Sequence, residues 1–163
     1  MQNSSITKEN CIARFNEIFN RDPKAYAYSP GRINLIGEHV DYQKGIVFPA
    51  AINKYIHGAA ATTQEPLIKV WSSFDHERVL EIKLDQLEPQ RGEDSWINYI
   101  IGVIAQYIKK GAKVGGLEIV FESDLPPGSG MSSSAALEST TALLIESLFN
   151  FTLKPIERAK ALQ

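Results

Sequence analysis

Cysteine and long apolar stretches are scarce in this sequence of 163 residues, whose single cysteine is Cys11. One cysteine excludes an intramolecular disulfide framework and fits a reducing compartment. No apolar run reaches the ~20 residues that a membrane-spanning helix needs. The N-terminus, Met-Gln-Asn-Ser-Ser, lacks the basic and apolar regions of a secretory signal peptide. We therefore expect a soluble cytoplasmic protein with no membrane partner.

An excess of charge of either sign is also lacking, because 17 Lys and Arg residues stand against 19 Asp and Glu residues, for a net charge of −2. A basic surface is typical of proteins that bind nucleic acid or anionic membranes, so neither partner is expected. The hydrophobic content of 44% is ordinary for a globular protein. A chain of this length buries roughly 68–70% of its unfolded surface, which is enough for one domain with its own core.

Apolar periodicity divides the chain into helices and strands of a mixed α/β protein. Apolar residues recur at spacings of three and four over residues 8–19, which predicts a helix. Ser95 and Gly111 are favoured residues for the two ends of a second helix over residues 95–110. Further helices are expected over residues 135–149 and from Pro155, and strands over residues 25–28, 33–36, 46–52, 55–62, 67–73, 78–84 and 117–122.

Proline and glycine mark the ends of two predicted strands. Pro30-Gly31 precedes the strand at residues 33–36 and Gly37 follows it, so both are interpreted as turns. Pro49 lies inside the strand at residues 46–52 and has no N–H to donate, which predicts an edge strand or a bulge there.

Four ionisable side chains flank the strand at residues 33–36. Arg32 precedes it, and Glu38, His39 and Asp41 follow it. Loops at strand ends are where scaffolds usually place binding groups. Taken alone, Arg32 also fits a surface salt bridge, and the other three also fit a solvated loop or an incomplete metal site. The cluster is a candidate binding site on these grounds.

A second candidate site is the loop Leu-Pro-Pro-Gly-Ser-Gly-Met-Ser-Ser-Ser-Ala-Ala-Leu-Glu at residues 125–138, between a predicted strand and a predicted helix. Glycines let a backbone approach an anion, and the first turn of a helix offers unpaired N–H groups, so the pattern favours phosphate binding. The loop is not a Walker A motif, because no Gly-Lys-Ser/Thr follows its glycines. It is not the dinucleotide-binding fingerprint, because Ser133 replaces the third glycine. A flexible Gly/Ser connector is the alternative on composition alone.

Together the two motifs resemble those of a known family. The run Gly-Arg-Ile-Asn-Leu-Ile-Gly-Glu-His-Val-Asp-Tyr at residues 31–42 closely resembles the signature of galactokinases, members of the GHMP small-molecule kinase superfamily, with Val40 where Thr is usual. The second motif resembles the phosphate loop of the same kinases, with Met131 for the usual Leu. The resemblance implies an α/β (α+β) fold of the ribosomal-S5-domain-2-like type, with a mixed sheet packed against helices.

The resemblance also implies roles for individual residues. Arg32 is expected to stabilise charge on the transferring phosphoryl group, which suits a reaction that depends on positioning and electrostatics. The sugar hydroxyls are expected to be bound by Glu38, His39 and Asp41. The ATP-binding residues are expected to be Gly128, Ser129, Gly130, Met131, Ser132, Ser133, Ser134, Ser72 and Trp96. Ser134 is the expected protein ligand of Mg²⁺, which prefers oxygen ligands.

The implied activity is galactokinase, the ATP- and Mg²⁺-dependent phosphorylation of α-D-galactose at its anomeric hydroxyl, by a monomer. Residues 1–163 are expected to form the N-terminal sugar- and ATP-binding domain. The family's catalytic aspartate and second acidic Mg²⁺ ligand have no match here, so we expect a truncated chain without useful kinase activity. Two alternatives are a related sugar kinase, for instance on N-acetylgalactosamine, and a non-catalytic galactose sensor on the same fold.

Overall fold

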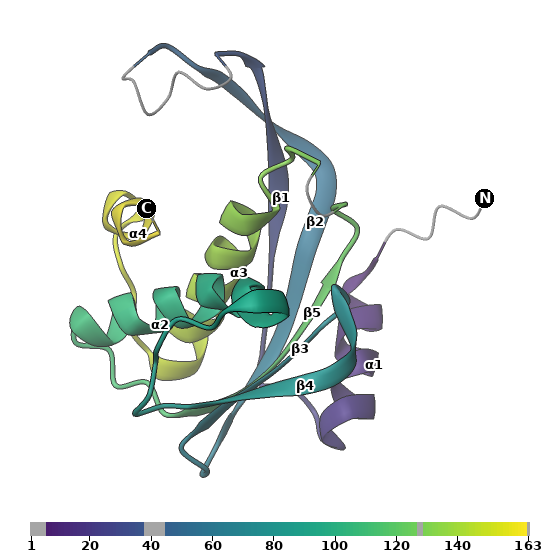
Figure 1. Cartoon of the computed structure of the whole chain (residues 1–163), viewed down its shortest axis with the longest axis vertical. Coiled ribbons are helices and arrows are strands. Elements are labelled where there is room, and N and C mark those ends of the chain that lie inside the picture. Colours follow the sequence, from purple (N-terminus) through teal and green to yellow (C-terminus); the bar gives the residue numbers. More distant parts are fainter. Residues whose placement is uncertain (1–5, 38–44, 127–128, 163) are drawn as a thin grey trace.

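The computed structural model describes residues 6–37, 45–126 and 129–162. These residues form one sheet with helices on both of its faces (Figure 1). In chain order the elements are α1 (Lys8–Phe19), β1 (Ala25–Ile36), β2 (Phe48–Thr63), β3 (Leu67–Ser72), β4 (Asp75–Lys83), the 3₁₀ helix η2 (Gly92–Ile97), α2 (Asn98–Lys109), β5 (Gly116–Ser123), α3 (Ser133–Phe149) and α4 (Pro155–Ala161).

The sheet is mixed, with five strands in the order β1-β2-β5-β3-β4. β3 and β5 run parallel, and every other neighbouring pair is antiparallel. A parallel pair needs a crossover connection, which α2 supplies between β4 and β5. The paired ends of β1 and β2 extend beyond the other three strands (Figure 1).

Each face of the sheet has its own apolar core, because strand side chains alternate between faces. α1 covers one face, where Cys11 and Phe15 are fully buried against β2 and β5. α2 and α3 cover the other face, where Ile56 of β2 and Phe121 of β5 are fully buried in the larger core. None of the helices among the described residues is long and apolar enough to cross a membrane.

The predicted turn at Pro30-Gly31 is wrong, because β1 continues through it. The pairing register of β1 against β2 shifts between Pro30 and Arg32, so the chain absorbs the irregularity as a bulge and stays in the sheet. β2 likewise passes through Pro49, which stands opposite Asn34. β5 pairs with β2 only from Ile56 onward, so the proline lies where β2 has β1 as its single strand partner, in agreement with the predicted edge position.

The helices follow the prediction more closely. α1 has the predicted bounds, and α4 begins at Pro155. Ser95 is not the N-cap of α2, because η2 precedes that helix and Ser95 lies inside η2. Gly111 follows the end of α2 with a φ of 98°, a conformation that suits glycine. The predicted mixed sheet packed against helices is what the structure contains.

Candidate active site

Arg32 and the N-terminus of α3 meet at a cavity of about 310 Å³. Arg32 is exposed on β1 and makes no ion pair with any residue that the structure describes. The cavity is lined by Ser29, Pro30, Arg32, Ser132, Ala135, Ala136 and Ser139. No carboxylate is among these residues, so a fixed positive charge faces small and hydroxyl-bearing side chains.

The first turn of α3 presents uncapped backbone donors. Ser132 precedes the helix in a left-handed conformation, with φ 55° and ψ 43°, and no side chain of the described residues caps the helix there. The first helical bond runs from Ala136 N–H to the Ser132 carbonyl at 3.1 Å, which leaves the N–H groups of the three intervening residues outside the helical ladder. These donors and the positive end of the helix dipole favour an anion.

The loop before α3 is held against β1. The backbone N–H of Arg32 donates to the carbonyl of Met131, at 3.0 Å. Gly130 adopts a φ of 72°, which a side chain would strain, and the Ser129 hydroxyl donates to the Pro126 carbonyl at 2.7 Å. The strand that carries Arg32 and the loop that opens α3 are therefore one connected unit.

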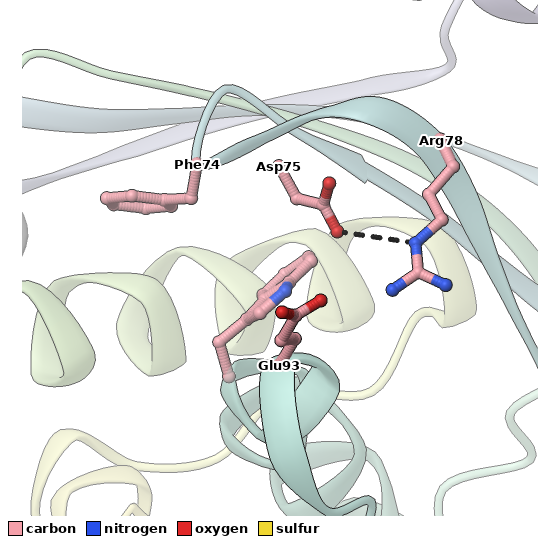
Figure 2. Close-up of a pocket in the computed structure, with 5 residues that line it drawn as sticks. Phe74, Asp75, Arg78 and Glu93 are labelled. Atoms are coloured by element: carbon pink, nitrogen blue, oxygen red, sulfur yellow. Dashed lines mark ion pairs between the residues drawn. The ribbon is translucent and has the colours of Figure 1, made fainter.

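A second cavity, of about 550 Å³, lies at the turn between β3 and β4. It is lined by Phe74, Asp75, Arg78, Glu93 and Trp96 (Figure 2). Arg78 is already engaged by two carboxylates, with its Nε 3.7 Å from Asp75 Oδ2 and its Nη2 bonded to Asp94 Oδ1. Its charge is thus neutralised locally, and the cavity as a whole is aromatic and acidic.

The indole of Trp96, which lines this second cavity, has an unused hydrogen-bond donor among the described residues. Its Nε1 is buried and has no hydrogen-bond partner among the described residues. Buried polar atoms are normally paired, so an orphan beside a cavity indicates a position for a ligand acceptor. Aromatic walls and a buried donor suit a planar, neutral, hydrogen-bonding group, whereas carboxylates disfavour a phosphate.

Not every predicted residue reaches a cavity. Ser72 is fully buried, and its hydroxyl accepts from Phe74 N–H at 3.2 Å, so it holds the turn that carries Phe74. Ser133 and Ser134 form the start of α3, beside the Arg32 cavity but not among its lining residues. Four predicted residues lie outside the described residues: Glu38, His39, Asp41 and Gly128.

Sequence reasoning missed several lining residues. Ala135, Ala136 and Ser139 lie on one helix face with Ser132, which was predicted, and their small side chains leave space beside Arg32. Their spacing is a signal that could have been found. Phe74, Asp75, Arg78 and Glu93 come together only through the β3–β4 turn and η2, and no sequence pattern marks them.

The ionisable core residues take no part in either cavity. Burial raises the pKa of the Cys11 thiol to about 12, so it stays protonated and unreactive. Burial lowers the pKa of His57, whose Nδ1 lies 2.6 Å from the Tyr26 hydroxyl. Both residues are buried, and neither lines one of the two cavities.

The described residues provide hydroxyl oxygens for a metal ion but no acidic cluster. No group of three or more His, Cys, Asp or Glu that could hold a metal occurs in the part of the chain that the structure describes. The hydroxyls of Ser132, Ser133 and Ser134 are oxygen donors of the kind that Mg²⁺ accepts when phosphates complete its shell. The residues present therefore fit Mg²⁺ only together with a phosphate ligand.

Two family models match the chain. The galactokinase galactose-binding signature matches residues 13–62, and the GHMP kinases N terminal domain matches residues 98–163. The first span contains Arg32, and the second contains the loop and first turn of α3. The matched spans thus include both walls of the Arg32 cavity.

Curated galactokinases are similar to nearly the whole chain. The galactokinase of Clostridium acetobutylicum is 39% identical over 152 residues, which span 92% of this chain and 39% of that protein. The galactokinase of Streptococcus mutans is 39% identical over 157 residues, which span 95% of this chain and 40% of that protein. The chain therefore spans about 40% of the length of these relatives.

Solved structures agree with the fold. Lactococcus lactis galactokinase complexed with galactose superposes with a TM-score of 0.83 at 38% identity, over 93% of this chain and 40% of that chain. Methanococcus jannaschii mevalonate kinase superposes with a TM-score of 0.73 at 23% identity, which shows a shared fold alone. The predicted fold class is confirmed by this agreement.

Proposed function

The chain belongs to the GHMP kinase family and matches the N-terminal part of its galactokinases, and from this premise we propose that it forms the substrate-binding part of a galactokinase. The proposed reaction transfers the γ-phosphoryl group of ATP to the anomeric hydroxyl of α-D-galactose, giving galactose 1-phosphate and ADP. The observation that carries the proposal is the cavity in which Arg32 faces the uncapped start of α3.

The phosphates of ATP occupy the Arg32 cavity in this proposal. The backbone N–H groups at the start of α3 bind phosphate oxygens, and the Arg32 guanidinium stabilises the charge that spreads over the transferring group. Because the Arg32 N–H is bonded to the Met131 carbonyl, the strand that carries the cation and the loop that carries the backbone donors hold fixed relative positions. Such preorganisation is what phosphoryl transfer requires of a protein.

The nucleobase of ATP occupies the second cavity. Phe74 and Trp96 provide apolar walls, and the Trp96 Nε1–H, which has no partner among the described residues, donates to a ring nitrogen. Asp75 and Glu93 can accept from an exocyclic amine or from ribose hydroxyls. Ser72 contributes by holding the turn of Phe74, through its bond to the Phe74 N–H.

Galactose binds through Glu38, His39 and Asp41, next to Arg32 in the sequence. Carboxylates accept hydrogen bonds from sugar hydroxyls, and a site built this way rejects epimers because its buried groups are left unpaired. Mg²⁺, held by Ser134 together with the ATP phosphates, would neutralise charge on the phosphates when bound.

The described residues supply no general base to this site. Among the described residues, those that line the Arg32 cavity include no carboxylate or histidine. We expect the 163 residues to bind both substrates without turning them over, and turnover to need further sequence of the kind that the longer relatives have. We also propose that the protein acts as a monomer in the cytoplasm, where ATP is available.

Calorimetric titration of this chain tests the proposal. Mg·ATP and galactose should each bind with 1:1 stoichiometry, and glucose should bind at least about 10-fold more weakly than galactose because one hydroxyl is misplaced. The variant Asp41→Asn should weaken galactose binding and leave Mg·ATP binding unchanged, whereas Asp85→Asn, an exposed carboxylate, should change neither. Failure of both ligands to bind would contradict the proposal, and tighter binding of N-acetylgalactosamine would replace galactose as the substrate.

A further inference from the structure

Gly31 lies at the closest approach between β1 and the loop that opens α3. A Cβ built on Gly31 would lie 2.5 Å from Leu125 Cδ2, 2.9 Å from the Met131 carbonyl oxygen and 3.2 Å from Ile52 Cδ1. Real Cβ atoms essentially never come within 3.0 Å of such neighbours, so two of these contacts require something to move. Gly31 stands in the chain between Pro30 and Arg32, two lining residues of the Arg32 cavity.

We propose that Gly31 is the positioning residue that lets the phosphate-binding loop dock on the strand of Arg32. This inference rests on the proposed function of the cavity and adds a residue to it. The missing side chain lets the Met131 carbonyl come within 3.0 Å of the Arg32 N–H. That single bond ties the arginine-bearing strand to the residue immediately before Ser132, where α3 is about to begin.

The three contacts of the built Cβ differ in how they can be relieved. Leu125 is a buried side chain, 2% exposed, whose end can adopt another rotamer at a modest cost. The Met131 oxygen belongs to the backbone, so it can move only if the loop moves. A side chain at position 31 therefore displaces the loop from β1 even when the core around Leu125 adapts.

The displacement has a chemical consequence. The anion-binding N–H groups of α3 follow Met131 directly, whereas the Arg32 guanidinium stays with β1. Moving the loop separates the two parts that must contact the same phosphate group. A shift of a few tenths of an ångström at such a site lowers affinity, because charge-assisted hydrogen bonds depend strongly on distance.

The test compares Gly31→Ala with Gly102→Ala in this chain. Gly102 lies inside α2 with nothing within 4 Å of a built Cβ, so alanine there fits and controls for the change of residue. Two readouts are taken: hydrogen exchange of the Arg32 amide relative to core amides of β5, and calorimetric affinity for inorganic tripolyphosphate with Mg²⁺. Loss of one intramolecular hydrogen bond should lower the protection of its amide against exchange about 3- to 10-fold.

In Gly31→Ala we expect the Arg32 amide to exchange about 10-fold faster relative to the β5 amides, and tripolyphosphate to bind about 10-fold more weakly. Gly102→Ala should change neither the exchange of the Arg32 amide relative to the β5 amides nor the affinity for tripolyphosphate. A purely structural role for Gly31 would accelerate exchange at all amides together, because it would lower global stability alone. Equal protection of Arg32 in Gly31→Ala and in the parent chain would overturn the inference.

The double variant Gly31→Ala/Leu125→Val guards against a failure to fold. Valine removes the Cδ2 atom of the tightest contact, so this variant should regain the melting temperature of Leu125→Val alone. Its tripolyphosphate affinity should remain low, because the Met131 carbonyl is still displaced. Recovery of affinity together with stability would overturn the inference. If the parent chain itself does not bind tripolyphosphate, the proposed function fails, while the Arg32 exchange rate still decides the role of Gly31.

Discussion

Two arginines of this protein, Arg158 and Arg32, lie in opposite electrostatic environments. Arg158 of α4 donates from Nε to Glu146 Oε1 at 2.9 Å and from Nη2 to Glu146 Oε2 at 2.6 Å. Tyr107 adds a third hydrogen bond to the same carboxylate, at 2.7 Å, and Leu153 N–H a fourth, at 3.3 Å. Arg32, in contrast, has no acidic partner among the described residues and faces a cavity.

We infer from this contrast that Arg158 contributes to stability, whereas Arg32 is available to bind a ligand. Around Glu146 every charge is paired, and the pairs join α2, α3 and α4 into one packed corner. Around Arg32 the charge, the helix N–H groups and, in the second cavity, the Trp96 indole N–H are left without protein partners among the residues described. Unpaired donors lower the stability of an empty site and increase the gain from an acceptor ligand.

Arg158→Ala should produce the largest effect of four substitutions or conditions that test this contrast. It leaves the Glu146 carboxylate, 8% exposed, without its ionic partner. Breaking a buried pair in this way costs about 3 kcal/mol, which for a chain of this size lowers the melting temperature by about 6–12 °C. Calorimetric melting measures it, with Lys160→Ala on the same helix as the exposed control. An unchanged affinity for Mg·ATP is also expected.

Arg32→Ala should have the reverse effect: it should weaken ligand binding and leave stability nearly unchanged. Stability should change by less than about 0.5 kcal/mol, because no ion pair is broken among the described residues. Affinity for Mg·tripolyphosphate should fall about 10- to 100-fold, the worth of a charged hydrogen bond. Arg78→Ala is the matched control, since Asp75 and Asp94 already hold that guanidinium. A melting temperature that falls as far as in Arg158→Ala would remove the distinction between the two arginines.

Acid should abolish the difference between the parent chain and Arg158→Ala. Burial alone would raise the pKa of Glu146, but the hydrogen bonds from Arg158, Tyr107 and the Leu153 N–H together lower it below the ordinary 4.5. A carboxyl whose folded pKa is lowered stabilises the fold fully above its unfolded pKa and loses that contribution as pH falls through the folded value. The gap in melting temperature should therefore be constant above pH 4.5 and narrow below it. A difference in melting temperature that widens in acid would contradict the assignment of Glu146 as the ionised partner of Arg158.

Trp96→Phe should produce the smallest effect. Phenylalanine keeps most of the aromatic wall but removes the Nε1–H donor, which is unpaired among the described residues, so Mg·ATP should bind about 3- to 10-fold more weakly. Mg·tripolyphosphate has no base and should bind as before. Equal weakening of both ligands would place the phosphates, not the base, beside Trp96.

The sequence predicted the elements better than their junctions. Regular apolar spacing located α1 to its terminal residues, and Pro155 located the start of α4, because local geometry determines both. Pro30-Gly31 was misread as a turn, because a bulge and a turn share the same residue types and only pairing with β2 distinguishes them. The start of α2 was misplaced because residues 92–97 form the separate 3₁₀ helix η2, which a favoured N-cap residue at position 95 does not reveal.

The candidate site, too, was predicted where a local sequence pattern marks it and missed where only the fold brings residues together. Arg32 and the serine-rich loop were found from their local patterns, and the fold brings them together in one cavity. The wall around Trp96 was not found, because its residues come from the turn before β4, from β4 and from η2, and no single sequence pattern joins these segments. Ser72 is buried at the end of an apolar strand, where its hydroxyl accepts from the Phe74 N–H and stabilises the turn. The residue type alone does not reveal this role.

The most direct test of the account is an NMR titration of the ¹⁵N-labelled chain with Mg·ATP. We expect saturable shifts, the largest at the backbone amides of residues 132–135 and at the Nε of Arg32, with a second group at the Trp96 indole N–H. Saturable binding that shifts neither the start of α3 nor Arg32 would contradict the assignment of this cavity to the phosphates of ATP.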